Sequence, residues 1–406
     1  MNIPFKPADI LLPKANFEKW AVIACDQFTS DSAYWRETKE IVGDSCSTLK
    51  ITLPEIYLEE KDTEKRIKNI NQKMNEYLNS SFFQEYKNAL IYIERTQPDG
   101  RIRPGLIGAV DLEEYDYKPT SKKMIRATEG TVLERIPPRV KIRKDAPLET
   151  PHTMLLIDDI NKTVIEPLSH QTNKMKKIYD FNLMMGGGHI KGYLVDESNK
   201  EQTLKNLEKL CESQSEPLLF AVGDGNHSLA TAKECYETEK TNTTDPLNLP
   251  SRYALVEIGN IHSDALDFEP IYRVLFNVTP ESILKELKEF FNQESNNTRI
   301  VYTYGNTEGN IDINVSAEKI PTGVIQEFID EYIKRHPETK VDYIHGVDDV
   351  KKLSSKKNSI GFIYEGISKD TLFESIKSTG SLPRKTFSMG EARDKRYYLE
   401  CRQIKK

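Results

Sequence analysis

The chain has 406 residues, of which 37% are hydrophobic and 30% charged, as is usual in a soluble globular protein. Lysine and arginine total 57 and aspartate and glutamate total 63, so the formal net charge is 57 − 63 = −6. This balance excludes a chain-wide nucleic-acid surface, which needs clustered positive charge. No apolar run approaches the roughly 20 residues that span a bilayer, and the N-terminal residues lack the pattern of a signal peptide. We therefore expect a cytoplasmic protein with no nucleic-acid or membrane partner.

Chain length and the positions of the cysteines limit the number of domains and the kinds of cross-link that we expect. The five cysteines are scattered, and none forms a CxxC pair, so we expect neither a disulfide framework nor a structural zinc site. A chain of this length should fold as two or three domains. We divide it into an N-terminal α/β region (1–120), a core with a charged loop and a strand–turn–helix (121–245), and a C-terminal α+β region (246–406).

In chain order, the first clear elements are a helix and a hairpin. Residues 64–78 carry apolar side chains at helical spacing. Residues 88–112 hold two β-type runs on either side of Pro98-Asp99-Gly100, a strong turn signal, and predict a hairpin. Residues 121–151 have many charges and little periodicity, which predicts a long irregular segment with one short helix at most.

Strands and helices then interleave to the end of the chain. Strands are expected at 152–159, 218–224, 252–260 and 270–278, and helices at 199–213, 228–237 and 323–335. The last block, from residue 358, should form a strand, a helix, a loop and a strand. Because hairpins occur beside these alternating elements, we predict an α+β or mixed α/β fold whose mixed sheets have flanking helices.

One turn combines side chains of chemical interest, in the stretch FAVGDGNHSLATAKE. Gly225 permits a close backbone approach, and Ser228 is placed to cap the helix that follows. The first amides of that helix, with Asn226 and His227 as side-chain donors, would offer hydrogen bonds to an anion. Asp224 adds a base or an oxygen ligand for magnesium. The pattern predicts a phosphate cradle, although the same residues also form ordinary polar turns, and it matches neither the Walker loop nor GxGxxG.

The same stretch resembles the DGHHR-type loop of the domain-of-unknown-function family 1015. Other matching segments are IPFKPADILLP with VIACDQF, GLIGAVDLEEY, IRATEGTVLER and GSLPRKTFSMGEARDKRYYLE, so the resemblance covers nearly the whole chain. The loop is in turn similar to the GxHR loop of the ParB and sulfiredoxin superfamily. Members of that superfamily bind nucleotide phosphates at the loop and the following helix, and some are free-serine kinases. The resemblance thus implies a ParB/sulfiredoxin-like core and ATP or ADP as ligand, with Mg²⁺ as a further candidate.

The chain departs from the family pattern in the loop itself. Asn226 stands where the family often has a histidine, and Ser228 stands where it has an arginine. Loss of the arginine removes a bidentate phosphate clamp, and loss of the cysteine that sulfiredoxins carry at position 226 argues against sulfiredoxin chemistry. Arg126 and Arg139 of the irregular segment could replace the charge if that segment is a mobile loop that closes over phosphates. A solvated loop with internal salt bridges is an equal alternative.

Other candidates lie outside the loop. Asp26 follows an apolar strand and matches the acid of the family's PYD sequence, so it is a candidate general base, although a hydrogen-bonded turn aspartate is an equal alternative. Cys25 is expected to be a small buried residue. Arg384, between a helix and the final strand, suits a phosphate contact. Glu149 and His152 could also reach the site.

We predict a nucleotide-dependent phosphotransferase that acts on a small hydroxyl metabolite, with free serine as one candidate. In this interpretation His227 donates to phosphate, and Asp26 or Asp224 serves as base or magnesium ligand. The alternative is a non-catalytic nucleotide- or metabolite-binding regulator, which the missing arginine favours. The expected catalytic residues are His227, Asp224 and Asp26, and the expected phosphate-binding residues are Gly225, Asn226, Ser228, Arg126, Glu129, Arg139 and Arg384; no residue is assigned to a dedicated metal site.

Overall fold

The chain forms two units. The computed structural model describes residues 3–212, 214–291, 298–313 and 320–405. Contacts group Met1–Leu266 with Glu391–Lys406 in the first unit and Asp267–Gly390 in the second. The second unit is therefore an insertion in the first. The first unit takes in the expected regions 1–120 and 121–245 together with both ends of 246–406, and that three-part division stays a prediction.

A mixed sheet forms the centre of the first unit. Its strands are β1 (Phe5–Lys6), β5 (Ile91–Thr96), β6 (Ile102–Asp111), β7 (Tyr115–Asp116), β8 (Ile125–Ala127), β10 (Met154–Ile157), β11 (Lys176–Asn182), β12 (His189–Leu194), β13 (Phe220–Asp224) and β14 (Tyr253–Asn260). They run in the order β11-β12-β5-β6-β14-β10-β13-β8-β7, and β1 pairs with β6. The β10–β14, β8–β13 and β7–β8 pairs are parallel, whereas β5–β6 is the expected hairpin. The predicted mixed α/β fold is confirmed.

Three two-stranded ribbons complete the strands of this unit as described. They pair β2 (Ala8–Pro13) with β4 (Phe83–Ala89), β3 (Val22–Ile23) with β21 (Tyr397–Tyr398), and β9 (Leu148–Glu149) with β22 (Arg402–Gln403). The last two ribbons bring the C-terminal segment back to strands that lie near the N-terminus and mid-chain. This return positions residues of the candidate site.

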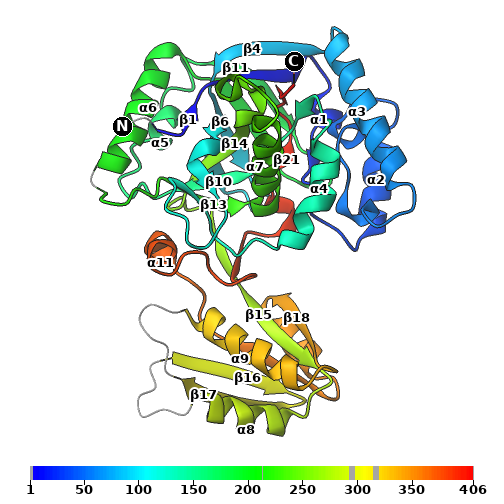
Figure 1. Cartoon of the computed structure of the whole chain (residues 1–406), viewed down its shortest axis with the longest axis vertical. Helices are drawn as coiled ribbons and strands as arrows, with labels where there is room; N and C mark the ends of the chain where they lie inside the picture. Colours follow the sequence, from blue (N-terminus) through cyan, green and yellow to red (C-terminus); the bar gives the residue numbers. More distant parts are fainter. Residues whose placement is uncertain (1–2, 213, 292–297, 314–319, 406) are drawn as a thin grey trace. The chain divides into compact units, whose positions relative to one another are not determined.

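Helices cover the sheet of the first unit. They are α1 (Phe17–Trp20), α2 (Ser32–Val42), α3 (Thr63–Asn79), α4 (Ile136–Arg143), α5 (Glu166–Ser169), α6 (Glu197–Glu212) and α7 (Asn226–Lys240). Leu229 and Tyr236 of α7 share a buried apolar cluster with Phe220 and Val222 of β13, and Figure 1 shows α7 lying over the strands. Helix α4 packs against α7. Burial of these side chains holds the start of α7 at the end of β13.

A buried ion cluster holds the C-terminal segment on the sheet. Glu257 of β14 accepts from Arg396 at 2.6 Å and from Arg103 of β6 at 3.3 Å, and each of these three side chains is at most 4% exposed. Arg396 also pairs with Glu400, which accepts from the Tyr179 hydroxyl at 2.5 Å. Buried charges of this kind are tolerated only when they are paired. The cluster therefore fixes Arg396, and with it the neighbouring residues of the candidate site.

The second unit is a smaller sheet with its own helices and its own buried apolar cluster. Its strands are β15 (Phe268–Phe276), β16 (Thr298–Tyr304), β17 (Thr307–Ile313), β18 (Lys340–His345), β19 (Ser359–Ile363) and β20 (Phe387–Met389), and its helices are α8 (Pro280–Phe290), α9 (Pro321–Arg335), α10 (Val347–Ser354) and α11 (Leu372–Thr379). The sheet order is β17-β16-β19-β15-β18, with β20 paired to β15. All these pairs are antiparallel.

Most predicted elements appear close to their expected places. The helices expected at 64–78 and 323–335 are α3 and α9, and the long segment 121–151 holds the single α-helix α4. The helix expected over 199–213 is α6; residue 213 lies outside the described residues. Short 3-10 turns link the elements: η1 (Thr48–Lys50), η2 (Glu55–Tyr57), η3 (Leu112–Glu114), η4 (Leu133–Arg135), η5 (Pro246–Asn248), η6 (Pro250–Arg252), η7 (Lys369–Thr371) and η8 (Ala392–Asp394). Within the part of the chain that is described, no helix has the length and apolarity needed to cross a bilayer.

Candidate functional site

Helix α7 begins directly after a left-handed glycine. Gly225 is the N-cap, with φ at 81°, and a Cβ there would lie 2.9 Å from the backbone of Thr153. The Leu229 N–H donates to the Gly225 carbonyl at 3.0 Å, which is the first bond of the helix. The expectation that Ser228 caps the helix is therefore wrong: Ser228 is in the first turn, and the Leu229 amide is used inside the helix. The N–H groups of residues 226–228 form the open end instead.

His227 ties this first turn to the charged segment 128–132. The Val132 N–H donates to His227 Nε2 at 3.2 Å, so the neutral ring carries its proton on Nδ1. Thr128 Oγ1 donates to the Val222 carbonyl at 2.7 Å and accepts from Asn226 Nδ2 at 3.4 Å. Among the described residues, Asn226 Oδ1 is buried and has no hydrogen-bond partner. Segment 128–132 therefore contacts the loop, and His227 Nε2 is used as an acceptor within the chain.

Asp26 lies in a second group of polar side chains, on the turn after β3. His152 Nε2 is 3.6 Å from Asp26 Oδ2, and Gln27 Nε2 donates to Asp26 Oδ1 at 3.0 Å. His152 Nδ1 is 3.0 Å from the Tyr398 hydroxyl of β21. His152 is 7% exposed, whereas the side chain of Asp26 is 28% exposed. Asp26 therefore has a buried partner on one side and solvent access on the other.

Lys395 joins the Asp26 group to the loop. Its Nζ is 3.5 Å from Asp224 Oδ2, and its side chain is 12% exposed. The other carboxylate oxygen of Asp224 accepts from the Gly225 N–H at 2.9 Å. Lys395 thus sits with Asp224 at the end of β13, where α7 starts, and it also acts on Asp26 through its charge.

These charges shift one another's titration. Burial alone would lower the pKa of His152, but the negative charge and hydrogen bond of Asp26, with the charges of Asp224 and Glu55, raise it above its ordinary value. Burial alone would raise the pKa of Asp26, but the charge and hydrogen bond of His152, with the charge of Lys395, lower it far below its usual range. Asp26 is therefore ionised at neutral pH, and His152 favours the imidazolium form.

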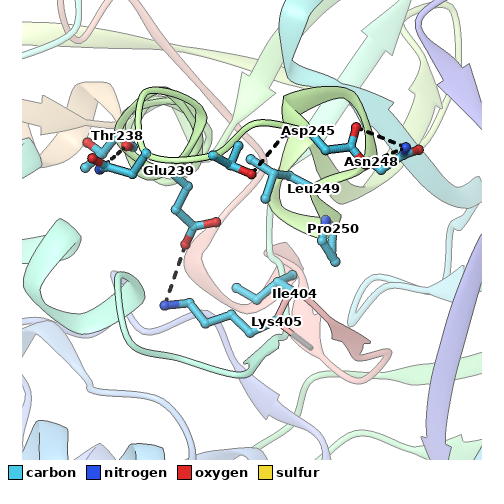
Figure 2. Close-up of a pocket in the computed structure, with 10 residues that line it drawn as sticks. Thr238, Glu239, Asp245, Asn248, Leu249, Pro250, Ile404 and Lys405 are labelled. Atoms are coloured by element: carbon cyan, nitrogen blue, oxygen red, sulfur yellow. Dashed lines mark hydrogen bonds and ion pairs between the residues drawn. The ribbon is translucent and has the colours of Figure 1, made fainter.

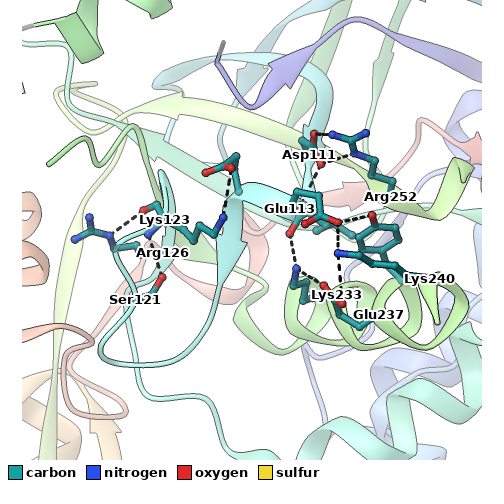
Figure 3. A network of polar contacts seen from close by, with 12 residues as sticks. Asp111, Glu113, Ser121, Lys123, Arg126, Lys233, Glu237, Lys240 and Arg252 are labelled. Atoms are coloured by element: carbon teal, nitrogen blue, oxygen red, sulfur yellow. Dashed lines mark hydrogen bonds and ion pairs between the residues drawn. The ribbon is translucent and has the colours of Figure 1, made fainter. Parts of the chain in front are cut away.

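The arginines proposed for phosphate binding lie in different places. Arg139 of α4 pairs with Glu55 and stays at the edge of the Asp26 group. Arg126 is buried on β8, where its Nε donates to the Lys123 carbonyl at 2.9 Å, and Figure 3 shows it apart from the α7 lysines. Arg384 belongs to the second unit, where its guanidinium lies 5.8 Å from the ring centre of Tyr343. Within the first unit, Arg139 acts on the group around Asp26 through its charge and its pair with Glu55.

Two acidic candidates differ in their surroundings. Glu129 is half-buried in the segment that contacts the loop. Glu149 instead accepts from Arg143 at 2.5 Å and from Arg402 at 2.7 Å, and its side chain is 2% exposed. Glu149 is therefore the centre of a separate buried ion cluster. The suggestion that it reaches the site is not supported by these contacts.

A surface pocket lies at the opposite end of α7 from the loop. It has a volume of about 470 Å³ and is lined by Thr238, Glu239, Asn242, Thr243, Asp245, Asn248, Leu249, Pro250, Ile404 and Lys405 (Figure 2). None of the residues proposed from the sequence lines it. The two ends of α7 therefore carry different surfaces, and the polar groups described above belong to the N-terminal end.

Two residues of the group, Lys395 and Tyr398, are missing from those predicted from the sequence, and both come from the C-terminal segment. His152 is predicted only as a residue that could reach the site. The signal for the first two is the charged and aromatic run DKRYYLE, which resembled the family best. The pattern of that run does not indicate which of its cations faces the loop.

Comparison with known proteins places the chain in a family. The model of the family described as "Protein of unknown function (DUF1015)" matches residues 3–399. The chain belongs to this family. No curated protein matches it. The family resemblance expected from the loop and the flanking motifs is thus confirmed for this DUF1015 chain.

Solved structures give only distant likenesses to the DUF1015 chain. A mutant free serine kinase in complex with ADP has a TM-score of 0.40 and 10% identity, and the match covers 74% of this chain and 92% of the kinase. A C-terminally truncated SbnI from Staphylococcus aureus has a TM-score of 0.38 and 9% identity, and the match covers 70% of this chain and 82% of SbnI. A conserved hypothetical protein from Pyrococcus furiosus has a TM-score of 0.38 and 11% identity, and the match covers 71% of this chain and 92% of that protein.

Proposed function

We propose that this chain binds the phosphate groups of a nucleotide at the start of α7 and transfers a phosphoryl group to the hydroxyl of a small metabolite. The observation that carries the proposal is that Lys395 Nζ lies 3.5 Å from Asp224 Oδ2 where the open end of a long helix follows β13, and that its positive charge also acts on the ionised carboxylate of Asp26. Phosphoryl transfer requires positioning, charge neutralisation and an acceptor for one proton. This corner of the first unit offers groups for all three.

The donor set fits a phosphate group. Backbone N–H groups at the first turn of α7 and the positive end of the helix dipole attract anions, and Lys395 adds a full positive charge. Asp224 opposes an anion unless a divalent cation accompanies it. Mg²⁺ is commonly held by one or two carboxylates together with the phosphates of its substrate. The described residues contain no cluster of three or more metal-ligating side chains, so Asp224 would hold such an ion jointly with the phosphates.

Each residue then has a defined task. Lys395 and the amides of residues 226–228 bind phosphate oxygens, and His227 holds segment 128–132 against this turn. Asp26 orients the attacking hydroxyl and accepts the proton that the hydroxyl loses as its oxygen bonds to phosphorus and the bond from phosphorus to the nucleotide breaks. Because Asp26 is ionised, both of its oxygens are acceptors. Free serine remains one candidate for the hydroxyl compound.

The second candidate function is a binding protein without turnover. The first turn of α7 carries Asn226, His227 and Ser228 and no arginine or lysine, so the loop itself has no charged phosphate clamp. In that case the same residues would hold a nucleotide or a metabolite, and Asp26 would be an acceptor for a ligand donor. Product formation separates the two functions.

The deciding experiment is incubation with ATP or ADP, Mg²⁺ and a pool of small hydroxyl metabolites that includes serine, followed by mass spectrometry. We expect a new phosphorylated species, and we expect Asp26→Asn to reduce its rate by about 10²–10⁴-fold. Lys395→Ala should weaken nucleotide binding by about tenfold or more. Lys122→Ala is the matched control, because this lysine is 79% exposed and pairs with Glu216.

The outcomes distinguish the alternatives. Nucleotide binding without product, over all acceptors, would favour the binding protein. Unchanged turnover in both Asp26→Asn and Lys395→Ala would remove this site from the mechanism. If no nucleotide binds, both functions are rejected.

A further inference from the structure

His152 occupies the buried side of the carboxylate that the proposed reaction uses. It lies just before β10, is 7% exposed, and places Nε2 3.6 Å from Asp26 Oδ2. Its other ring nitrogen is 3.0 Å from the hydroxyl oxygen of Tyr398. Because its two nitrogens contact two different partners, the orientation of the ring is fixed. His152 itself has little access to a ligand.

Tyr398 holds both the ring and the turn that carries Asp26. Its hydroxyl oxygen accepts the backbone N–H of Cys25 at 3.1 Å, and its hydroxyl proton points to Cys25 Sγ at 2.9 Å. The pairing of Tyr398 with Val22 fixes the strand from which this side chain projects. Since the only hydroxyl proton goes to sulfur, the hydroxyl must accept from His152, so Nδ1 carries a proton.

These hydrogen bonds then indicate the protonation state of the His152 ring. With Nδ1 protonated, Nε2 faces the Asp26 carboxylate either as a lone pair, which would repel it, or as an N–H group, which attracts it. The second arrangement makes the ring an imidazolium. Acidic groups from several elements face it, namely Asp26, Asp224 and Glu55, and they favour that charge. The positive charge of Lys395 also acts on Asp26.

We propose that His152 is the positioning residue of Asp26: Tyr398 orients its ring, and the ring holds the carboxylate aimed at the substrate hydroxyl. The inference rests on the proposed function, in which Asp26 accepts the hydroxyl proton. Gln27 binds Oδ1 and His152 faces Oδ2, and each carboxylate oxygen keeps a further lone pair for the substrate. His152 thus acts through Asp26 and touches no reacting atom.

Cys25 is the other group in this cluster that could have a chemical role. Burial, followed by the negative charge of Asp26, raises the pKa of the Cys25 thiol to about 12. A thiol in this state is a poor nucleophile, because the thiolate is the reactive form. It serves instead as the acceptor that fixes the Tyr398 hydroxyl. The chain of contacts therefore runs from Cys25 through Tyr398 and His152 to Asp26.

The test follows the His152 ring by NMR in the full chain labelled on histidine. Its signal is identified as the one missing from His152→Gln. In the unchanged chain we expect the ring to stay protonated at pH values above 6.5, the ordinary pKa of histidine. Asp26→Asn should lower the pKa of His152, because it removes the negative charge that raises this pKa most. Tyr398→Phe should lower it less, because the ion pair remains.

Kinetics provide the second measurement. We expect His152→Gln to lower kcat by about 10–100-fold, the usual effect of removing a group that orients a reacting side chain, with little change in the KM for nucleotide. His189→Gln is the matched control, since His189 also pairs with an aspartate, Asp180 at 2.6 Å, but lies 29% exposed on β12. It should leave kcat unchanged.

The two proposals fail in different ways. A His152 ring that titrates near the ordinary value, both in the unchanged chain and in Asp26→Asn, overturns the inference whatever the turnover. If His152→Gln instead raises the KM for nucleotide by about 10–100-fold and leaves kcat unchanged, the inference is also overturned. Absence of any product, with a shifted titration that Asp26→Asn abolishes, would reject the proposed function and support the pairing.

Discussion

At the scale of the residue, Gly225 decides where α7 begins. Its φ of 81° is a left-handed conformation, which glycine adopts without cost. The N-cap therefore needs no side chain, and the helix begins at Asn226. Ser228 looked like a cap because serine is common at that position. The error in the expected start of the helix comes from reading the serine and overlooking what the glycine before it permits.

A left-handed conformation costs a non-glycine residue about 1–2 kcal/mol. Gly225→Ala should lower the free energy of unfolding by more than this amount. The reason is that the new Cβ would lie 2.9 Å from the Cα of Thr153, a backbone atom that cannot swing away. Urea unfolding measures the effect. Gly100→Ala is the matched control: its φ is 88°, but nothing lies within 4 Å of its Cβ. Equal losses in the two variants would show that Thr153 gives way.

The residues of the candidate site could be predicted only in part. The loop was visible because glycine, carboxylate, amide and imidazole lie together in sequence. His152, Lys395 and Tyr398 come from segments that are far from the loop in sequence, and the pairing of β3 with β21 brings the segment of Lys395 and Tyr398 beside that of Asp26. Short-range patterns contain no information about such pairing. The roles of all these residues stay predictions.

At the scale of the element, periodicity located most helices and strands, but it could not give the order of the sheet. Strand β10 pairs in parallel with β14, and β8 pairs in parallel with β13, across long stretches of intervening sequence. A buried strand is apolar on both faces, so its pattern does not name its neighbours. The order follows from how all the apolar faces are buried together.

Glu257 of β14 is the element-scale feature with the largest expected effect on stability. Glu257→Gln should lower the free energy of unfolding by about 3–5 kcal/mol, because it removes the buried carboxylate that pairs with Arg103 and leaves Glu400 to compensate Arg396. Urea unfolding again measures it. Glu85→Gln, which breaks an exposed pair with Lys87 at 3.8 Å, should stay within about 0.5 kcal/mol. A similar small change for Glu257 would mean that the two arginines find other acceptors.

At the scale of the whole molecule, the chain enters and leaves the second unit at one place. The Gly390 N–H donates to the Asp267 carbonyl at 3.1 Å, and Phe268 pairs with Met389. The two junctions are therefore neighbours. Chain length predicts more than one domain, but an inserted unit leaves no compositional boundary in the sequence, so the boundaries at 266 and 391 could not be expected.

Replacement of residues 267–390 by a short Gly/Ser linker should leave the first unit folded, because the ends that the linker joins are already adjacent. Circular dichroism and the NMR signal of His152 would both be retained. As a comparison, deletion of 391–406 should abolish that signal, since it removes β21, β22 and Arg396. Loss of structure in the linker variant, at the level of the deletion, would show that the first unit depends on the second.

The insertion also determines the order in which parts of the first unit become available for folding during translation. Domains usually fold as they emerge, N-terminal first, but this first unit receives two strands and the ion partner of Glu257 only from residues beyond 390. Asp224 and Asp26 are translated long before Lys395 and Tyr398. The growing polypeptide therefore carries these acidic side chains without their basic and phenolic partners until residues 395–398 are synthesised, so this group of side chains is completed only after the whole second unit has been translated.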